Sequence, residues 1–241
     1  MTWLNSFLFA GLPYIALAVF FIGTIVRYRS TGFKVSSLSS QFLEGKNLFW
    51  GAVPFHWGLL VILLGHFLAF LIPDAVLAWN IGVRLIVLEV TGFSFALCVL
   101  VGLSFLLYRR LTNARLRMVT NRMDIVIEVV LLAQVVLGLW IALGYRWGSS
   151  WFAADLSPYL WSLVKLNPQI AAVSNMPLVI QLHVVLAFVI IVVFPFTRLV
   201  HILVAPLHYI GRPYQRVMWN WDRRRVRKPE NGWTPTRPKN N

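Results

Sequence analysis

The chain has 241 residues, of which 59% are hydrophobic and only 12% are charged. So little charge cannot cover the surface of a soluble domain, so the composition excludes one large water-soluble core and indicates a membrane protein. A net charge of +14 is also typical of nucleic-acid-binding proteins, but here Lys and Arg cluster beside the apolar runs, as in membrane proteins. We therefore expect contact with membrane lipid and no nucleic acid. The single cysteine, Cys98, excludes disulfides and cysteine-ligated clusters.

Five stretches are long and apolar enough to cross the hydrocarbon core, which needs about 20 residues of helix. In chain order they are approximately Trp3–Val26, Trp50–Ile72, Leu85–Tyr108, Ile125–Gly144 and Leu178–Val200. The sequence thus predicts an all-α, polytopic membrane protein with five transmembrane helices in a bundle. We expect a membrane domain over residues 1–217 and a basic cytoplasmic tail over residues 218–241.

The basic residues set the expected orientation in the cell membrane. Most of the 22 Lys and Arg residues follow the first span, follow the third span or lie in the tail. By the positive-inside rule the amino terminus then lies outside and the tail is cytoplasmic. The loop Tyr145–Pro177 is rich in aromatic residues, and we expect it to lie along the outer membrane surface as a short amphipathic helix.

Four of the five histidines fall in the second and fifth spans, as His56 and His66 and as His183 and His201. A strongly polar side chain inside hydrocarbon indicates a functional site. Because the two helices run in opposite directions, His66 is expected opposite His183 on the outer side, and His56 opposite His201 on the inner side. Two histidines that face each other across a gap between apolar helices are typical of a low-spin b-type haem site.

The spacing of these histidines suits the pairing only in part. The 18 residues from His183 to His201 correspond to about five whole turns, which places both imidazoles on one face of a helix. The ten residues from His56 to His66 leave those two about 80° apart, so helix tilt and a kink at Pro195 must absorb the difference. His208, at the cytoplasmic edge, competes with His201 as the inner ligand. Zinc is the rival metal, but histidines on opposite sides of a membrane cannot close one tetrahedral shell.

Other polar residues and glycines in the spans have local interpretations. We expect Glu89, near the outer end of the third span, to form an ion pair or a helix cap, and likewise Asp124 and Glu128 beside the basic Arg109–Arg122 segment. A proton path through these acids is the alternative. Gly58 and Gly65 leave room for a porphyrin or a second helix to approach closely.

Several short segments, in this order, carry a resemblance to a known family. They are Leu12-Pro13-Tyr14-Ile15-Ala16, Phe55-His56, Gly65-His66-Phe67, Gln181-Leu182-His183, Phe194-Pro195-Phe196-Thr197-Arg198-Leu199-Val200-His201 and Gly211-Arg212-Pro213-Tyr214-Gln215. With them the chain resembles the membrane cytochrome b (gamma) subunits of respiratory nitrate reductases, over nearly its whole length up to about Val217.

The resemblance implies two haems b, a distal one on His66 and His183 and a proximal one on His56 and His201, which agrees with the pairing above. It also implies that quinol is oxidised near the distal haem. Electrons then pass to the proximal haem, to a cytoplasmic iron–sulfur (beta) subunit and finally to a molybdenum catalytic (alpha) subunit. The family's quinol pocket resembles Gly65 and His66 with a lysine, and the nearest matching cation here is Arg84.

Two further alternatives stay open at this point. In the first, the chain is a b-type cytochrome with another partner, such as a heterodisulfide-reductase-like, sulfur-metabolising or nitrite-oxidising complex. In the second, it is a haem-free transporter or anchor. The subunits that co-purify distinguish the first alternative, and a visible spectrum of the purified chain decides the second. For a nitrate reductase subunit, we expect the basic segment Arg109–Arg122 and the tail from Arg212 to dock the iron–sulfur subunit.

Overall fold

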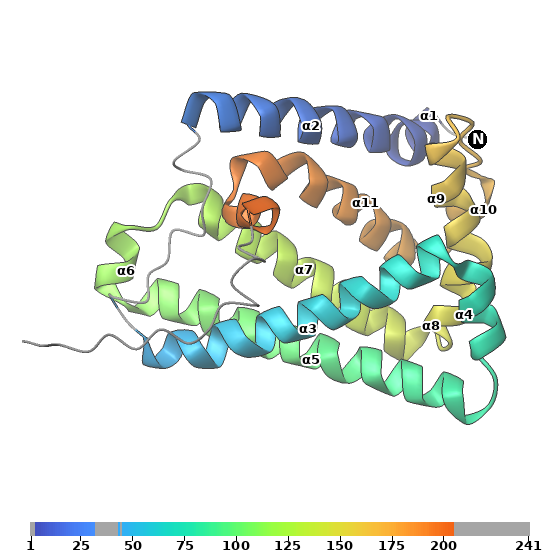
Figure 1. Cartoon of the computed structure of the whole chain (residues 1–241), viewed down its shortest axis with the longest axis horizontal. Coiled ribbons are helices and arrows are strands. Elements are labelled where there is room, and N and C mark those ends of the chain that lie inside the picture. Colours follow the sequence, from blue (N-terminus) through green and yellow to red (C-terminus); the bar gives the residue numbers. More distant parts are fainter. Residues whose placement is uncertain (1–2, 32–42, 44, 205–241) are drawn as a thin grey trace, which may run out of the picture. The chain divides into compact units, whose positions relative to one another are not determined.

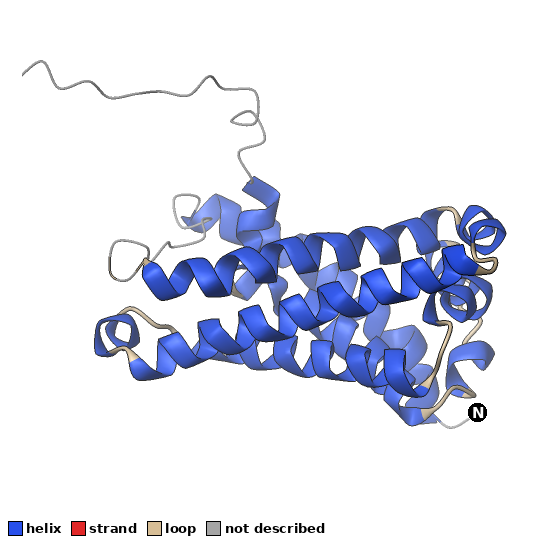
Figure 2. Cartoon of the chain, turned by 90° about the horizontal axis from the view of Figure 1, so that it is seen from below, coloured by secondary structure: helices blue, strands red, loops and turns tan. Residues whose placement is uncertain are grey.

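The described part of the chain is helical throughout. The structure, a computed structural model, describes residues 3–31, 43 and 45–204, and these form helices joined by short loops, with no strand among them (Figure 2). Five helical stretches are long and apolar enough to cross a membrane: Trp3–Ser30, Asn47–Leu71, Val83–Thr112, Arg122–Gly144 and Leu178–Phe196. The prediction of an all-α protein with five candidate membrane spans is confirmed.

Short helical turns flank the long helices in chain order. The elements are α1 (Trp3–Ser6), the π-helical η1 (Phe7–Gly11), α2 (Leu12–Thr31), α3 (Lys46–Leu71), α4 (Pro73–Trp79), α5 (Val83–Thr112), α6 (Ala114–Met118), α7 (Arg122–Gly144), α8 (Gly148–Trp151), the π-helical η3 (Phe152–Leu156), α9 (Ser157–Val164), α10 (Ala171–Ser174), α11 (Leu178–Val193), and the 3-10 helices η4 (Phe194–Phe196) and η5 (Arg198–Val204). The described residues up to Val204 form one compact unit. His208 and the expected tail, residues 218–241, lie outside the described residues.

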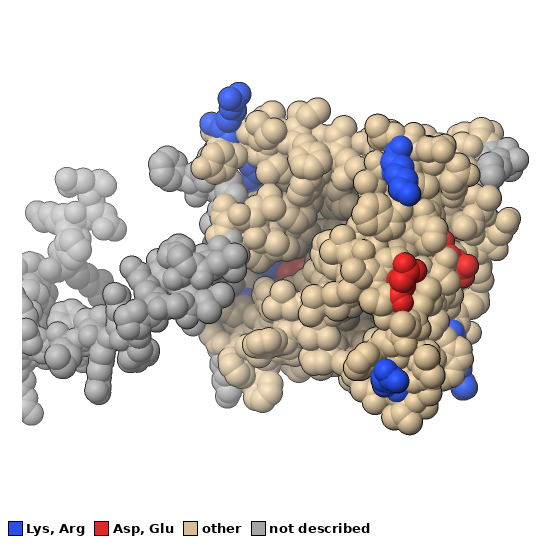
Figure 3. All heavy atoms as spheres, turned by 45° about the vertical axis from the view of Figure 1, so that its right-hand side comes forward, with Lys and Arg blue, Asp and Glu red and all other residues tan. Residues whose placement is uncertain are grey.

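The long helices pack in an order that leaves α3 and α11 apart. α3 packs on α5, α5 on α7, α7 on α11, and α11 on α2 (Figure 1). Within this compact unit, α6 marks one end (the α6 end) and α9 the other (the α9 end). Figure 3 shows a groove in one face, with acidic and basic atoms at its floor. α3 and α11, which carry three of the four histidines in the candidate spans, are thus not among the helix pairs that pack extensively.

Glycines bring α3 and α5 into close contact. A Cβ atom on Gly58 would lie 2.6 Å from the carbonyl oxygen of Phe95, and one on Gly102 would lie 2.6 Å from the backbone nitrogen of Phe55. Only residues without a side chain allow two helix backbones to approach so closely. The expectation that Gly58 admits a close neighbour is confirmed, and that neighbour is a helix.

The outer surface of the helices is apolar. Large side chains such as Trp57, Phe67, Val87 and Trp140 are more than half exposed along the candidate spans. A water-soluble protein rarely exposes so continuous an apolar surface. In a bilayer the same surface meets lipid, while the helices satisfy their own backbone hydrogen bonds. The chain is a multi-pass membrane protein.

The segment between α7 and α11 forms a cap of short helices at the α9 end, and Tyr159 and Trp161 of this segment pack inward. Tyr159 is only 1% exposed, and its hydroxyl donates a hydrogen bond of 2.8 Å to the carbonyl oxygen of Phe9. Trp161 stacks on Phe70 at 5.1 Å between ring centroids and donates to its carbonyl oxygen. Several short helices thus replace the single surface helix expected from the sequence, and Tyr159 belongs to a core that includes Val184 of α11.

We predict that Tyr159→Phe lowers the free energy of unfolding by about 1–3 kcal/mol, because it leaves the buried carbonyl of Phe9 unpaired. Thermal unfolding of the purified protein in detergent measures this, with the exposed Tyr108→Phe as the control. Burial also raises the pKa of the Tyr159 hydroxyl. The unfolded state therefore loses the tyrosine proton first, and the contribution of Tyr159 to the free energy of unfolding falls as pH rises above the ordinary tyrosine pKa of about 10. Tyr159→Phe should lack this part of the alkaline loss, and an unchanged pH profile would contradict the assignment.

Candidate functional site

The four histidines of the candidate spans lie on three elements. His56 and His66 are on α3, His183 is on α11 and His201 is on η5. His56 and His66 are exposed in the folded chain, although both lie within an apolar span. An imidazole that faces hydrocarbon is costly. Both side chains therefore need a polar or metal partner.

The rings of His56 and His201 are spaced like two axial ligands of one metal ion. Their centroids lie 6.2 Å apart. A metal–imidazole bond is about 2.0 Å long, and the centroid of a ring with bonds of about 1.33 Å lies about 1.1 Å from each ring atom. Two imidazoles on opposite sides of one metal ion thus have centroids about 6.2 Å apart. Ordinary ring pairs share this range of separation, so the state of the ring nitrogens decides between the two interpretations.

Hydrogen bonds fix which nitrogen of each ring is free. Nδ1 of His56 lies 2.7 Å from the carbonyl oxygen of Ala52, and Nδ1 of His201 lies 2.6 Å from that of Arg198. His66 repeats the pattern, with Nδ1 2.8 Å from the carbonyl oxygen of Ile62. Because a carbonyl only accepts, Nδ1 carries the proton and Nε2 keeps its lone pair. Metal-binding histidines are typically arranged in this way, and the donor set fits a haem.

His183 is held differently, by α7. Nε2 of His183 lies 3.2 Å from the side-chain nitrogen of Gln134. A Cβ atom on Gly138, one turn further along α7, would lie 3.2 Å from Cε1 of the same ring. Nδ1 of His183 is buried and has no hydrogen-bond partner within the described structure. A buried imidazole nitrogen without a partner calls for one, and a metal ion supplies such a partner.

His66 packs against the cap at the α9 end. Its ring centroid lies 5.3 Å from that of Phe152 in η3. Among the described residues, the rings of His66 and His183 are not in contact as those of His56 and His201 are. The structure therefore brings the expected inner pair of rings together, and it places the expected outer pair on two separate helices, α3 and α11.

The segment that carries His201 is not a continuation of α11. α11 ends at Val193, and Thr197 is extended, with φ −115° and ψ 178°. Pro195 lacks the backbone N–H that would continue the helix. The expectation that His183 and His201 share one face of a continuous helix is wrong. The expected bend at Pro195 is present, as a complete break, and the carbonyl oxygens of Pro195 and Thr197 accept hydrogen bonds from Arg27 of α2.

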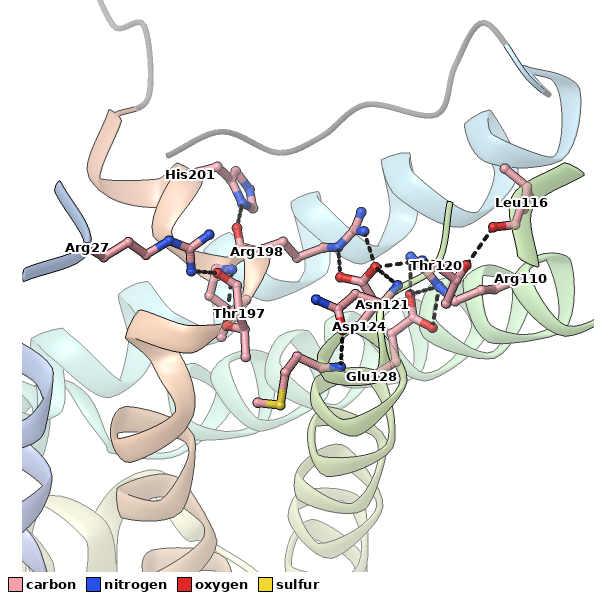
Figure 4. Close-up of polar contacts among 12 residues, drawn as sticks. Arg27, Arg110, Leu116, Thr120, Asn121, Asp124, Glu128, Thr197, Arg198 and His201 are labelled. Carbon is pink, nitrogen blue, oxygen red and sulfur yellow. Dashed lines mark hydrogen bonds and ion pairs between the residues drawn. The ribbon is translucent and has the colours of Figure 1, made fainter. Parts of the chain in front are cut away.

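The acidic residues of α7 form a buried charged cluster at the α6 end (Figure 4). Glu128 pairs with Arg110 at 2.8 Å, and Asp124 pairs with Arg198 at 2.7 Å and with Arg110 at 3.3 Å. Asp124 also accepts from the backbone N–H of Asn121 and so caps α7. The expected ion pairs and cap are confirmed.

Glu89 caps a short helix at the α9 end. Its Oε1 accepts hydrogen bonds from the backbone N–H and the hydroxyl of Ser149 in α8, at 2.8 and 2.7 Å. The local role expected for Glu89 is confirmed.

The residues expected to line a quinol pocket are accessible. A Cβ atom on Gly65 would meet nothing within 4 Å, so the surface of α3 beside His66 is open. Arg84 lies in the first turn of α5, with its guanidinium carbon 5.2 Å from the centroid of the Trp79 ring. Among the described residues it makes no hydrogen bond, ion pair or ring contact with His66.

A closed metal-ion site is not formed by the residues that the structure describes. Groups of three or more His, Cys, Asp or Glu side chains that could hold a metal ion do not occur among them. A haem needs only one or two axial side chains, because the porphyrin supplies the other ligands. Within the described residues, the arrangement of His56 and His201 therefore suits a haem.

Known proteins of one family match almost the whole chain. Residues 5–220 match the family described as nitrate reductase gamma subunit. The chain belongs to this family. It is 33% identical over 216 residues to the nitrate reductase gamma chain of Bacillus subtilis (strain 168), covering 87% of this chain and 96% of that protein. It is 35% identical over 219 residues to the respiratory nitrate reductase 2 gamma chain of Escherichia coli (strain K12), covering 89% and 97%.

A longer relative contains a similar segment. The nitrate reductase-like protein NarX of Mycobacterium tuberculosis (strain ATCC 25618 / H37Rv) is 32% identical over 208 residues, which are 84% of this chain and 32% of that protein. A segment similar to this gamma subunit thus also occurs within a longer protein.

Three residues that hold the histidine segments of this gamma subunit are not singled out by its sequence. Gln134 and Gly138 contact His183, and Arg27 binds the backbone at the break in the last span. A polar side chain in the middle of an apolar span is the one signal that points to Gln134. Nothing in the pattern indicates that it faces His183.

We predict that Gly102→Ala destabilises the gamma subunit, since the added methyl group meets the backbone of Phe55, next to His56. Overpacking of this kind typically costs about 1–3 kcal/mol. The matched control is Gly92→Ala on the same helix, because a Cβ atom there meets nothing within 4 Å. Thermal unfolding of the two purified variants should separate them, and equal stability would contradict the close packing of α3 on α5.

Proposed function

We propose that this gamma subunit is the quinol-oxidising, membrane-anchoring cytochrome b of a respiratory nitrate reductase complex. The observation that carries the proposal is the pair His56 and His201, whose rings are spaced as axial ligands and whose Nε2 atoms are free. Membership of the family and the five apolar helices support it.

Two haems b are assigned to two pairs of histidines. His66 and His183 hold the outer, distal haem, and His56 and His201 hold the inner, proximal haem. When bound, the haems supply one-electron carriers at two depths of the membrane between quinol and an iron–sulfur subunit. The chain fixes the imidazole tautomers through the carbonyl oxygens of Ala52, Ile62 and Arg198.

The α6 end is assigned to the cytoplasm and the α9 end to the outside. The basic residues Arg109, Arg110, Arg115 and Arg117 gather in and before α6, as the positive-inside rule requires of a cytoplasmic side. The amino terminus is then outside. We assign residues 1–217 to the membrane domain and residues 218–241 to a cytoplasmic tail. The basic cytoplasmic segments dock the iron–sulfur (beta) subunit, which connects to the molybdenum catalytic (alpha) subunit.

Quinol binds on the outer side, beside Gly65 and His66 and near Arg84. The open surface at Gly65 leaves room for a flat ring. Arg84 is exposed and lies in the first turn of α5. A fixed cation there stabilises the negative charge that develops on a quinol oxygen as its proton leaves.

We predict that the purified complex contains two haems b per gamma subunit, as measured by pyridine haemochrome analysis. His66→Ala and His183→Ala should each remove one haem, and His56→Ala and His201→Ala the other, because a buried iron loses an axial nitrogen that no neighbour replaces. Low-temperature visible spectra of the four variants should fall into these two classes. A haem-free wild-type preparation from haem-replete cells would falsify the proposed function.

We predict that Arg84→Ala slows the reduction of both haems by quinol at least tenfold while haem content stays unchanged, because the developing negative charge loses its cation. The matched variant Arg84→Lys keeps the charge and should retain most of the rate. Stopped-flow spectra with a quinol analogue, in membranes of known haem content, measure both. Equal rates for Arg84→Ala and the wild type would remove Arg84 from the quinol site.

A further inference from the structure

Helix α7 contains no histidine, yet its side chains reach both histidine-bearing segments of the last span. Gln134 and Gly138 contact His183 of α11, and Asp124 binds Arg198 of η5. The histidines of α3 also donate to carbonyl groups of their own helix, but among the described residues neither Ala52 nor Ile62 forms a side-chain hydrogen bond or ion pair with α7 as Arg198 does. The two halves of each expected haem site are thus oriented in different ways.

At the α6 end, the link from α7 to His201 passes through one residue. Arg198 donates from Nε and Nη2 to the two carboxylate oxygens of Asp124, at 2.8 and 2.7 Å, a two-bond contact that fixes the guanidinium plane (Figure 4). The carbonyl oxygen of the same Arg198 accepts the Nδ1–H of His201. Fixing Arg198 therefore fixes the acceptor that orients the imidazole.

The broken backbone makes this link necessary. An α-helix would hold His201 through a continuous ladder of hydrogen bonds, but the ladder stops at Val193. The 3-10 helix η5 that follows is short and has poorer hydrogen-bond geometry than an α-helix. The ion pair with Asp124 supplies from outside the constraint that the segment lacks.

Near the middle of α7, the contact with His183 is direct. The amide group of Gln134 lies at hydrogen-bond distance from one ring nitrogen, and the missing side chain of Gly138 leaves the space that the ring occupies. The side-chain oxygen Oε1 of Gln134 is itself buried without a partner within the described structure. An amide can present that oxygen to a ring N–H, the contact that orients ligand histidines in metal sites.

We infer that α7 is the positioning helix of the subunit: Asp124, through Arg198, sets the orientation of His201, and Gln134 with Gly138 sets that of His183. These are positioning residues, since none of them is assigned as a ligand. The inference rests on the proposed function, in which His201 and His183 belong to different haems. Each haem then has its own positioning contact on α7, and the two contacts are separable by mutation.

The experiment uses the complete complex in membranes and records two quantities for each haem. These are the g-values of the oxidised low-spin iron in electron paramagnetic resonance and the midpoint potential from redox titration of the visible spectrum. His201→Ala and His183→Ala first assign the signals, because each should remove one of them. If neither variant removes a signal, the proposed function fails and the positioning inference falls with it.

The positioning variants are then compared with the assigned signals. Asp124→Asn, and independently Arg198→Gln, should shift the g-values and potential of the His201 haem and leave the other unchanged. Gln134→Leu, and independently Gly138→Ala, should shift only the His183 haem. Loss of such supporting contacts typically weakens metal binding about 10–100-fold, so partial loss of the affected haem is also expected.

The matched control is Glu128→Gln. Glu128 lies one turn from Asp124 on α7 and is equally buried, but its ion pair is with Arg110 alone in the described structure. This variant should leave both haems unchanged. If Asp124→Asn and Glu128→Gln behave alike, or if the Gln134 and Asp124 variants disturb both haems together, α7 has only a general structural role and the inference is overturned.

Discussion

The structure depends on one constraint: polar groups inside the apolar helices must find their partners within the protein. Hydrocarbon offers no hydrogen bonds, so an unpaired polar group there costs several kcal/mol. The two acids of α7 meet two arginines, and the carbonyl groups of Pro195 and Thr197 at the helix break meet Arg27. Three imidazoles donate to backbone carbonyls. These few contacts determine how α2, α7 and the last span fit together, because apolar packing alone leaves helices free to slide and rotate.

The spans follow from the sequence because their cause is local. Length and apolar composition decide whether a helix crosses a membrane, and both are read directly from the chain. The fourth span fits this rule despite Asp124 and Glu128, since each acid has an arginine partner inside the protein. The end of the last span could not be predicted in the same way. Proline predicts a bend there, but the carbonyl oxygens of Pro195 and Thr197 at the break are bound by Arg27, which belongs to the first span.

In the candidate site, too, some features follow from the sequence and others depend on contacts between distant segments. Helix direction predicts the opposition of His56 and His201, and the two ring centroids do lie 6.2 Å apart, although His201 lies beyond a break and not on the helix of His183. The free nitrogen of each ring depends on the carbonyl that its own backbone happens to offer. Gln134 and Gly138 become significant only once it is known which face of α7 meets α11, and one sequence does not reveal that. The contact of Arg84 with Trp79 likewise depends on the turn made by α4.

The break at Pro195 also bears on the order in which the subunit is built. Arg27 and the carbonyls that it binds are 168 and 170 residues apart in sequence. α3 and α5 are consecutive spans and are able to close as a hairpin soon after both are made, because short loops close at little entropic cost. The segment with His201 has no fixed place until the fifth span has met both the first and the fourth. During synthesis from the amino terminus, His56 is therefore in place before His201. Completion of that pair is a late event, because it requires the contacts of the last span with the first and fourth spans.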